Sequence, residues 1–331
     1  GMHSRKFNPN DFVFPTYNTG GTATGASISA PYLQTYRVNR ANRDQRRRTL
    51  SFKADWRATR HSVVTFGVNW NDLATAAGGV NFIPTAGTIG NPTPAPGVGF
   101  SYGSDFVSGA TGRGGVTLSG NNGIFGAESL SPRLSYRFDD GTWKIDAVVN
   151  QSKATRERPR AADMKDIFGM SATLNVPSRI VFSDIDPVRG PGRVQAFNAS
   201  NQEVDLNDLS NYRITAATDT AQYITTRVRS GDLNIRRRIE RLPYPASVQV
   251  GGSQRVQSRD NRGEQRSSAY NGVNGNLSPT PFAFKSWLNQ DAGFGWKGIP
   301  TYSLSRIYDA WLANPALFTQ TAALVRASEV Y

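Results

Sequence analysis

Residues 50–57 read Leu-Ser-Phe-Lys-Ala-Asp-Trp-Arg, and this alternation of apolar and polar side chains decides the fold. Successive side chains of a β-strand point to opposite faces of a sheet, so the segment has one apolar face and one charged face. The alternation resumes after the short connector 58–61 and continues to Trp70. Residues 49–71 are therefore predicted to form an antiparallel hairpin.

Two further segments repeat this design. Between residues 130 and 151, apolar positions alternate on both sides of Asp140-Gly141, a dipeptide typical of tight hairpin turns. A weaker copy spans residues 231–259, where Pro243 and Pro245 end the pairing. The sequence thus predicts three antiparallel hairpins, each with one apolar face.

A membrane-spanning β-barrel explains these hairpins better than a soluble β-sandwich. Each alternating stretch holds about eight to ten residues, close to the roughly 9–11 that a tilted strand needs to cross a bilayer. Aromatic residues such as Trp56, Trp70 and Trp143 mark the strand ends, and aromatic residues gather at both membrane interfaces. In a sandwich the apolar faces of two sheets would meet across a shared protein core, and this fold stays as the alternative.

The barrel interpretation assigns a side to each strand residue. The residues predicted to face lipid are Leu50, Phe52, Trp56, Phe66, Trp70, Tyr136, Phe138, Trp143, Ile145 and Val248. The residues predicted to face a polar lumen are Lys53, Asp55, Arg133, Arg137, Lys144, Asp146 and Gln249. The density of charge in the second set suits a water-filled pore.

The connections between the hairpins are far longer than the turns within them. They span about residues 72–129, 152–221 and 261–331. Outer-membrane barrels show the same asymmetry, with short periplasmic turns and long external loops. Short helices are expected in the last connection, at Leu304–Ala313 and Pro315–Ala327. The predicted fold is therefore all-β: an antiparallel transmembrane barrel, represented by about six or more strands of a larger barrel, with short helices in its long external loops.

The last connection is also rich in aromatic residues. They are Trp287, Phe294, Trp296, Tyr302, Tyr308 and Trp311. Either they stack on a ligand ring, or they anchor the connection by packing on one another. Short helices need a hydrophobic contact to persist, so the sequence favours self-packing.

The composition excludes several kinds of chemistry. The chain of 331 residues has no Cys and only two His, which excludes thiolate metal sites, cysteine nucleophiles and multi-histidine metal sites. No stretch of about 18 apolar residues is present, which excludes a transmembrane helix. We predict no catalytic, cofactor or metal site, and hence no enzymatic activity.

An excess of basic residues indicates anionic partners. The chain has 38 Lys and Arg against 25 Asp and Glu, a net charge of +13, and two arginine triplets at residues 46–48 and 236–238. In a barrel, Arg46 and Arg48 would lie just beyond the apolar band, at the phosphates of lipopolysaccharide, and Arg237 would meet phosphates of the inner leaflet. A solvated strand extension is the simpler alternative. Nucleic acid is disfavoured, because the aromatic residues do not form a basic stacking platform.

Several segments resemble parts of TonB-dependent outer-membrane receptors. They are Ala54-Asp55-Trp56-Arg57, the strand Leu134–Phe138 with the following residues 139–146, and Ala246–Gly252. The likeness covers most of the chain and depends on pattern. It implies a receptor with an internal plug inside a barrel of about 22 strands. Six strands cannot close such a barrel and no plug is visible, so the chain is interpreted as an internal fragment without its plug domain and remaining strands.

The predicted function is active transport across the outer membrane of a Gram-negative-type bacterium. The resemblance implies a siderophore, cobalamin or glycan type of nutrient, imported with energy relayed by TonB. Expected partners are outer-membrane lipids and lipopolysaccharide, TonB through a plug region absent here, and a small or medium nutrient ligand, without nucleic acid. Two alternatives stay open: a soluble, extracellular β-rich module that binds glycans or anions, and a passive porin.

Overall fold

An antiparallel sheet of ten strands forms the body of the protein. The computed structural model describes residues 2–20, 26–87, 99–159, 169–284, 300–321 and 325–330. The main path through the sheet is β1 (Met2–Asn18), β2 (Tyr32–Thr59), β3 (Ser62–Thr85), β6 (Gly115–Asp139), β7 (Trp143–Arg158), β12 (Tyr212–Ile239), β13 (Ala246–Tyr270) and β14 (Phe318–Gln320). In addition, β8 (Gly169–Leu174) pairs with both β6 and β12, and β15 (Val325–Val330) pairs with β13. The fold is all-β and antiparallel, as predicted.

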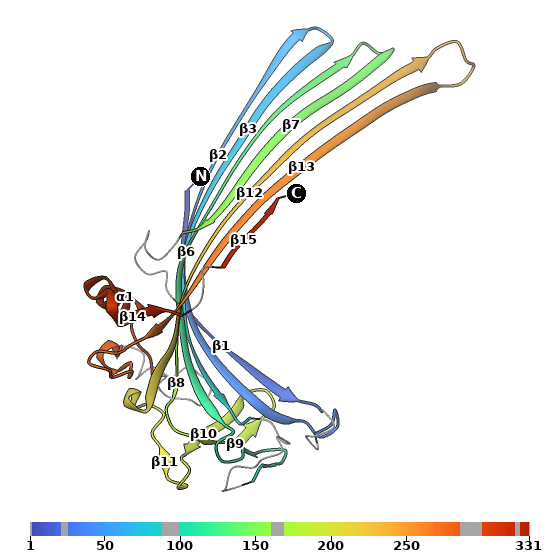
Figure 1. Cartoon of the computed structure of the whole chain (residues 1–331). Coiled ribbons are helices and arrows are strands. Elements are labelled where there is room, and N and C mark those ends of the chain that lie inside the picture. The colour runs from blue at the N-terminus through green and yellow to red at the C-terminus, as the bar shows by residue number, and fades with distance from the viewer. Residues whose placement is uncertain are drawn as a thin grey trace.

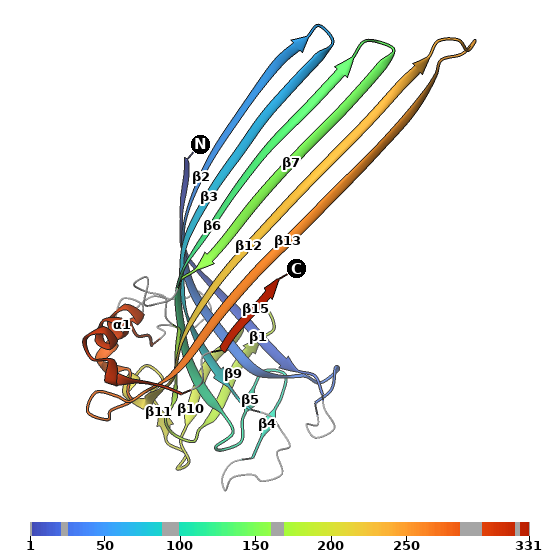
Figure 2. The same ribbon diagram turned by 45° about the horizontal axis from the view of Figure 1, so that its top comes forward.

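Three hairpins extend side by side from one end of this sheet (Figures 1 and 2). They are β2–β3, β6–β7 and β12–β13, and each closes through a short turn. We call the parts nearest the turns, residues 49–71, 130–151 and 231–259, the hairpin arm, and the opposite end of the sheet the loop end. The two termini lie partway along the sheet at opposite edges, on β1 and β15 (Figure 1).

The strands are much longer than the alternating pattern predicts. Both β2 and β12 have 28 residues, a length of about 90 Å at 3.3 Å per residue. The predicted loops 72–129, 152–221 and 261–331 are therefore wrong over much of their length, because all three begin with the continuation of a strand and the first two also end inside one. Beyond the hairpin arm both faces of the strands carry polar residues, as at Arg43–Arg48, so the alternation of apolar and polar side chains disappears while the pairing continues.

A second, smaller sheet and one helix cover the loop end. The smaller sheet follows the order β11 (Glu203–Val204), β10 (Gly190–Phe197), β9 (Arg179–Asp186), β5 (Val107–Ser108) and β4 (Ser101–Tyr102). The helix is α1 (Leu304–Ala313), and Ser303 caps it by accepting a hydrogen bond from the backbone N–H of Arg306. Short 3₁₀ turns lie at Leu209–Asn211, Thr280–Phe282 and Pro315–Leu317. The buried hydrophobic core lies here; its most buried large residues are Tyr32, Tyr36, Tyr212, Phe82, Phe182, Leu33, Ile180 and Ile307.

One of the two predicted helices is confirmed and the other is wrong. The helix Leu304–Ala313 forms as predicted. The segment 315–327 begins with a 3₁₀ turn at Pro315–Leu317 and then forms β14 and β15 in place of a helix. Both strands pair with β13, at Ser268–Tyr270 and Asp260–Gln265. Pairing with a distant strand thus overrides the local helical signal.

No helix in the described part of the chain is both long and apolar enough to span a bilayer.

Candidate functional site

The strand register sorts the predicted side chains onto two opposite faces of the hairpin arm. Directly paired residues share a face, and the pairs Leu50–Trp70, Phe66–Leu134 and Ile145–Ile235 run across five strands. We call this side the apolar face. All ten residues predicted to face lipid lie on it, and all seven predicted lumen residues lie on the other side, the polar face.

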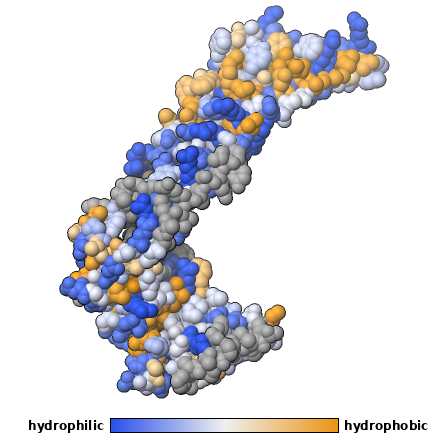
Figure 3. Space-filling model, in the orientation of Figure 1, coloured by the Kyte–Doolittle hydropathy of each residue, from blue (hydrophilic) through white to orange (hydrophobic). Residues whose placement is uncertain are grey.

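The apolar face is bare in the hairpin arm. Trp56 is 67% exposed, Phe52 56% and Val250 70%. No buried residue of the hydrophobic core belongs to the hairpin arm. Figure 3 shows hydrophobic residues gathered over this arm, with a mainly hydrophilic stretch between it and the loop end. Large exposed apolar patches mark surfaces that meet a membrane or another protein.

The same face is covered by protein at the loop end. In β2, Tyr36 and Val38 have the parity of Leu50 and are buried, and in β6 Leu118 has the parity of Tyr136. Tyr302, just before α1, donates a hydrogen bond from its hydroxyl to the carbonyl oxygen of Met170 at 2.8 Å. Burial raises the pKa of Tyr36 to about 12. One face of the sheet is therefore apolar at both ends, but only one end has a protein cover.

A strip of charged residues separates the two apolar regions of this face. We call it the ionic belt; its members are Arg46, Arg48, Asp72, Glu128, Lys153, Glu157, Arg227, Asp260 and Arg262. Trp70, the last aromatic residue of the bare region, donates its indole N–H to Glu128 at 2.7 Å. The predicted head-group residues Arg46 and Arg48 both lie in this belt.

The polar face holds ion pairs and hydrogen-bonded ladders. Arg137 and Lys144 both pair with Asp146, at 3.3 and 3.9 Å. Lys53 pairs with Asp55 at 3.1 Å, and Thr65 donates a hydrogen bond to the same carboxylate. Arg133 and Gln249 also lie on this face.

Near the loop end the polar face continues as a ladder of amides and hydroxyls. The side-chain amide of Asn39 donates to Asn81 at 2.6 Å, and that of Asn81 donates to Ser119 at 3.1 Å. A second ladder joins Thr49, Asn71 and Ser129. This face is therefore polar from the turns to the loop end.

Two carboxylates fix the turn of the second hairpin, and Asp139 accepts a hydrogen bond from the backbone N–H of Gly141 at 3.0 Å. Asp140 accepts hydrogen bonds from the backbone N–H groups of Trp143 at 2.6 Å and Thr142 at 2.9 Å. These bonds hold the pKa of Asp140 below its ordinary value. Gly141 follows with φ of +89°, a conformation that favours glycine. Nearby, the predicted head-group residue Arg237 places its guanidinium 5.0 Å from the ring centre of Trp143.

The aromatic residues of the last connection divide into two groups. Tyr302 and Tyr308 are buried in the core, and the rings of Tyr308 and Trp311 lie 5.6 Å apart. This packing agrees with the interpretation that they anchor the connection. Trp287, Phe294 and Trp296 lie outside the described residues.

Neither a metal-binding cluster nor a similarity to known proteins indicates a function for this chain. Within the described ranges, no group of three or more His, Cys, Asp or Glu side chains is placed to hold a metal ion. Comparison with known protein families, with curated proteins and with solved structures finds no match to this chain. The two-faced sheet is therefore the feature from which function has to be argued.

Sequence reasoning missed two features of this site. The ionic belt was missed because apolar and polar residues do not alternate regularly along its strands. The strand β1, in which Met2 lies opposite Arg48 of the belt, was not predicted either. The second feature is a large apolar depression in the hairpin arm, which depends on the register of five strands. The only early signal was Arg46 and Arg48, whose shared parity with Leu50 placed charge beside the apolar band.

Proposed function

We propose that this chain forms part of the wall of an outer-membrane β-barrel that transports a nutrient. The observation that carries the proposal is the bare apolar face of the hairpin arm, bounded by aromatic and charged residues. From Leu130 to Phe138 this face covers about 26 Å of strand at 3.3 Å per residue. Tilting lowers that height, and the lipid-facing band of such barrels is about 25 Å tall.

The boundaries of the bare region support lipid as its cover. At the turns it ends with Trp56 and Trp143, and toward the loop end it ends with Trp70 against the ionic belt. Indole rings favour membrane interfaces, because one part is apolar and the other donates a hydrogen bond. A protein partner would not need aromatic residues at both borders together with a charged strip beyond one of them.

The open edges of the arm support a larger barrel. Among the described residues, Thr49–Thr59 of β2 and Ala246–Arg259 of β13 have a strand on only one side. Unpaired backbone N–H and C=O groups are costly in hydrocarbon, and a closed barrel avoids this cost because every strand pairs on both sides. We therefore propose that further strands pair with both edges. The polar face would then line the lumen, where Arg137, Lys144 and Asp146 meet water.

The proposals of active uptake and of the nutrient class both rest on the likeness of these strands to TonB-dependent receptors. Its test uses the whole gene in its own bacterium. After deletion, growth is measured with a ferric siderophore, cobalamin or a glycan as the limiting nutrient, and in parallel after loss of TonB. We expect the same growth defect on one nutrient in both strains.

Two other outcomes would decide against this function. Uptake that depends on the gene but not on TonB indicates a passive porin. Recovery of the protein in the soluble extracellular fraction, folded without detergent, indicates the soluble binding module. Outer-membrane fractionation of the same cells distinguishes these cases.

A further inference from the structure

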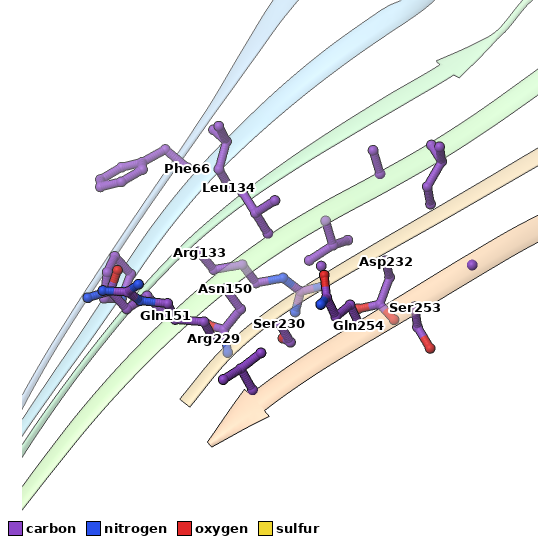
Figure 4. A pocket seen from close by; sticks show the side chains of 18 residues that line it. Phe66, Arg133, Leu134, Asn150, Gln151, Arg229, Ser230, Asp232, Ser253 and Gln254 are labelled. Atoms are coloured by element: carbon purple, nitrogen blue, oxygen red, sulfur yellow. The ribbon is translucent and has the colours of Figure 1, made fainter. Parts of the chain in front are cut away.

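A wide depression lies in the apolar face of the hairpin arm (Figure 4). Its volume is about 1050 Å³, at the upper end of the volumes of ligand-binding pockets. Side chains from β3, β6, β7, β12 and β13 line it, among them Phe66, Leu134, Val149 and Leu233. All four belong to the apolar face by register.

Two glycines leave the depression open. Gly231 of β12 and Gly252 of β13 lie on the apolar face, in neighbouring rows of the sheet. A Cβ atom at Gly252 would meet nothing within 4 Å, and one at Gly231 would meet only two atoms, both of β7, at 4.0 Å. Neither glycine has a positive φ, so the backbone does not require glycine at these positions. Their absent side chains make room for a ligand.

Three cations stand at the end of the depression nearest the loop end. Arg227 of β12 lies directly opposite Lys153 of β7, and Arg229, two residues along, has its side chain on the same face. Directly opposed side chains have Cβ atoms about 5 Å apart, where like charges repel. None of the three cations forms an ion pair within the described part of the chain.

The nearest acidic residues on this face have other partners. Asp260 pairs with Arg262 at 2.9 Å, and Glu128 accepts the indole N–H of Trp70. The cation cluster therefore lacks an anion, although carboxylates elsewhere in the ionic belt lie beside basic residues. Lys and Arg donate several hydrogen bonds to phosphate oxygens, which suits a phosphorylated ligand.

We propose that the depression binds one molecule of lipopolysaccharide through its lipid A part. The acyl chains would cover Gly231 and Gly252, and a phosphate would bind Lys153, Arg227 and Arg229. The size of the depression suits several chains, and the position of the cations at its loop-end rim matches a head group at the outer surface. This inference rests on the proposed membrane location and names a specific lipid site within it.

The test measures lipid retention by the full-length gene product folded in detergent micelles. Native mass spectrometry counts the lipid A molecules that stay bound during titration with purified lipid A. We expect one tightly held molecule. Replacing both glycines by leucine (Gly231→Leu with Gly252→Leu) should weaken this binding by about tenfold or more, because the leucines occupy the space of the acyl chains. Gly67→Val is the control on the polar face, where a Cβ atom would meet only the carbonyl oxygen of Phe52 at 3.8 Å.

A second pair of variants tests the phosphate contact. The double variant Arg227→Gln with Arg229→Gln should bind lipid A more weakly than the unchanged protein does. Removing the phosphates from lipid A should weaken its binding to the unchanged protein by the same amount. Circular dichroism of each variant establishes that its strands still form. If the variant with Gly231→Leu and Gly252→Leu retains as much lipid A as the unchanged protein, the proposed site is wrong. If phosphatidylglycerol binds as tightly as lipid A, lipid A is not the specific occupant.

The same preparation separates this inference from the membrane proposal. Insertion into phosphatidylcholine vesicles, measured by protection of the hairpin arm from protease, tests the membrane location without lipid A. If the chain inserts but retains no lipid A, only the lipid site fails. If it does not insert, the proposed function fails as well.

Discussion

At the scale of single residues, the hairpin turns and the core depend on a few polar contacts with clear energetic signs. The carboxylate of Asp140 accepts two backbone N–H groups that would otherwise lack a partner in the turn. The hydroxyl of Tyr302 donates to the carbonyl oxygen of Met170 and lies 3.3 Å from that of Leu118, so it joins β8 and β6 to the segment that leads into α1. Each contact makes a distinct prediction.

The first prediction concerns the pH dependence of the second turn. The folded pKa of Asp140 is lowered, so its ionised form stabilises the fold above the unfolded pKa of about 3.9, and this stabilisation is lost as the pH falls through the folded pKa. Asp140→Asn should therefore lower the urea midpoint at pH 7 and lower it by less near pH 3, which is below the unfolded pKa. Glu240→Gln, in the third turn, is the control. An equal shift at both pH values would show that ionisation of Asp140 is irrelevant.

The second prediction concerns the buried hydroxyl of Tyr302. Tyr302→Phe should lower the free energy of unfolding by about 1–3 kcal/mol, because the carbonyl of Met170 loses a buried donor. Burial raises the pKa of this phenol, so Tyr302 stays protonated and the effect should not vary between pH 6 and 9. Tyr223→Phe, at an exposed residue of β12, should change stability by less than about 0.5 kcal/mol. Chemical unfolding followed by near-ultraviolet circular dichroism measures both.

At the scale of elements, sequence patterns identified strands only where the two faces differ. The hairpin arm was found because Leu50–Trp56 alternates with charged residues. The helix Leu304–Ala313 was also predicted, and in the structure Ser303 caps it while Leu304, Ile307 and Tyr308 are buried on one side. The middle of β2 was missed because charge occupies both faces there. No local signal could reveal that Phe318–Gln320 pairs with Ser268–Tyr270.

The candidate site followed the same rule. Parity within each strand was enough to assign all seventeen lipid and lumen candidates to two faces, because a hairpin transmits parity across its turn. The depression and the opposed pair Lys153 and Arg227 could not be predicted, because they depend on the register between different hairpins. The residues that join the hairpins, 86–114 and 159–211, carry no sequence signal that predicts this register.

The third prediction tests which solvent covers the apolar face. Phe52→Arg should destabilise the protein in lipid vesicles by about 2–4 kcal/mol, because it places a charge among acyl chains. Ser51→Arg, next along β2 on the polar face, should have an effect near zero. Both are measured by urea unfolding from vesicles, with tryptophan fluorescence as the signal. Near-neutral results for both variants would show that water covers both faces and would contradict the barrel.

At the scale of the whole molecule, the two ends of one sheet differ in what stabilises them. The loop end has a buried core that joins the large sheet, the small sheet and α1. The hairpin arm is a single layer with Phe52, Trp56 and Val250 exposed, so it has no such core. Since hydrophobic burial is the main favourable term in folding, the arm needs an external apolar phase and the loop end does not.

The fourth prediction follows from this difference. In buffer without lipid, limited proteolysis should cut the hairpin arm at its turns first, for example after Arg60 and Arg241, while a fragment containing β9, β10 and α1 resists. Transfer into vesicles should protect the strands of the arm and leave the loop end unchanged, because only the arm gains a hydrophobic cover. Mass spectrometry of the fragments gives the cut sites. Equal resistance of the arm with and without lipid would mean that protein covers its apolar face, which is the arrangement of a soluble sandwich.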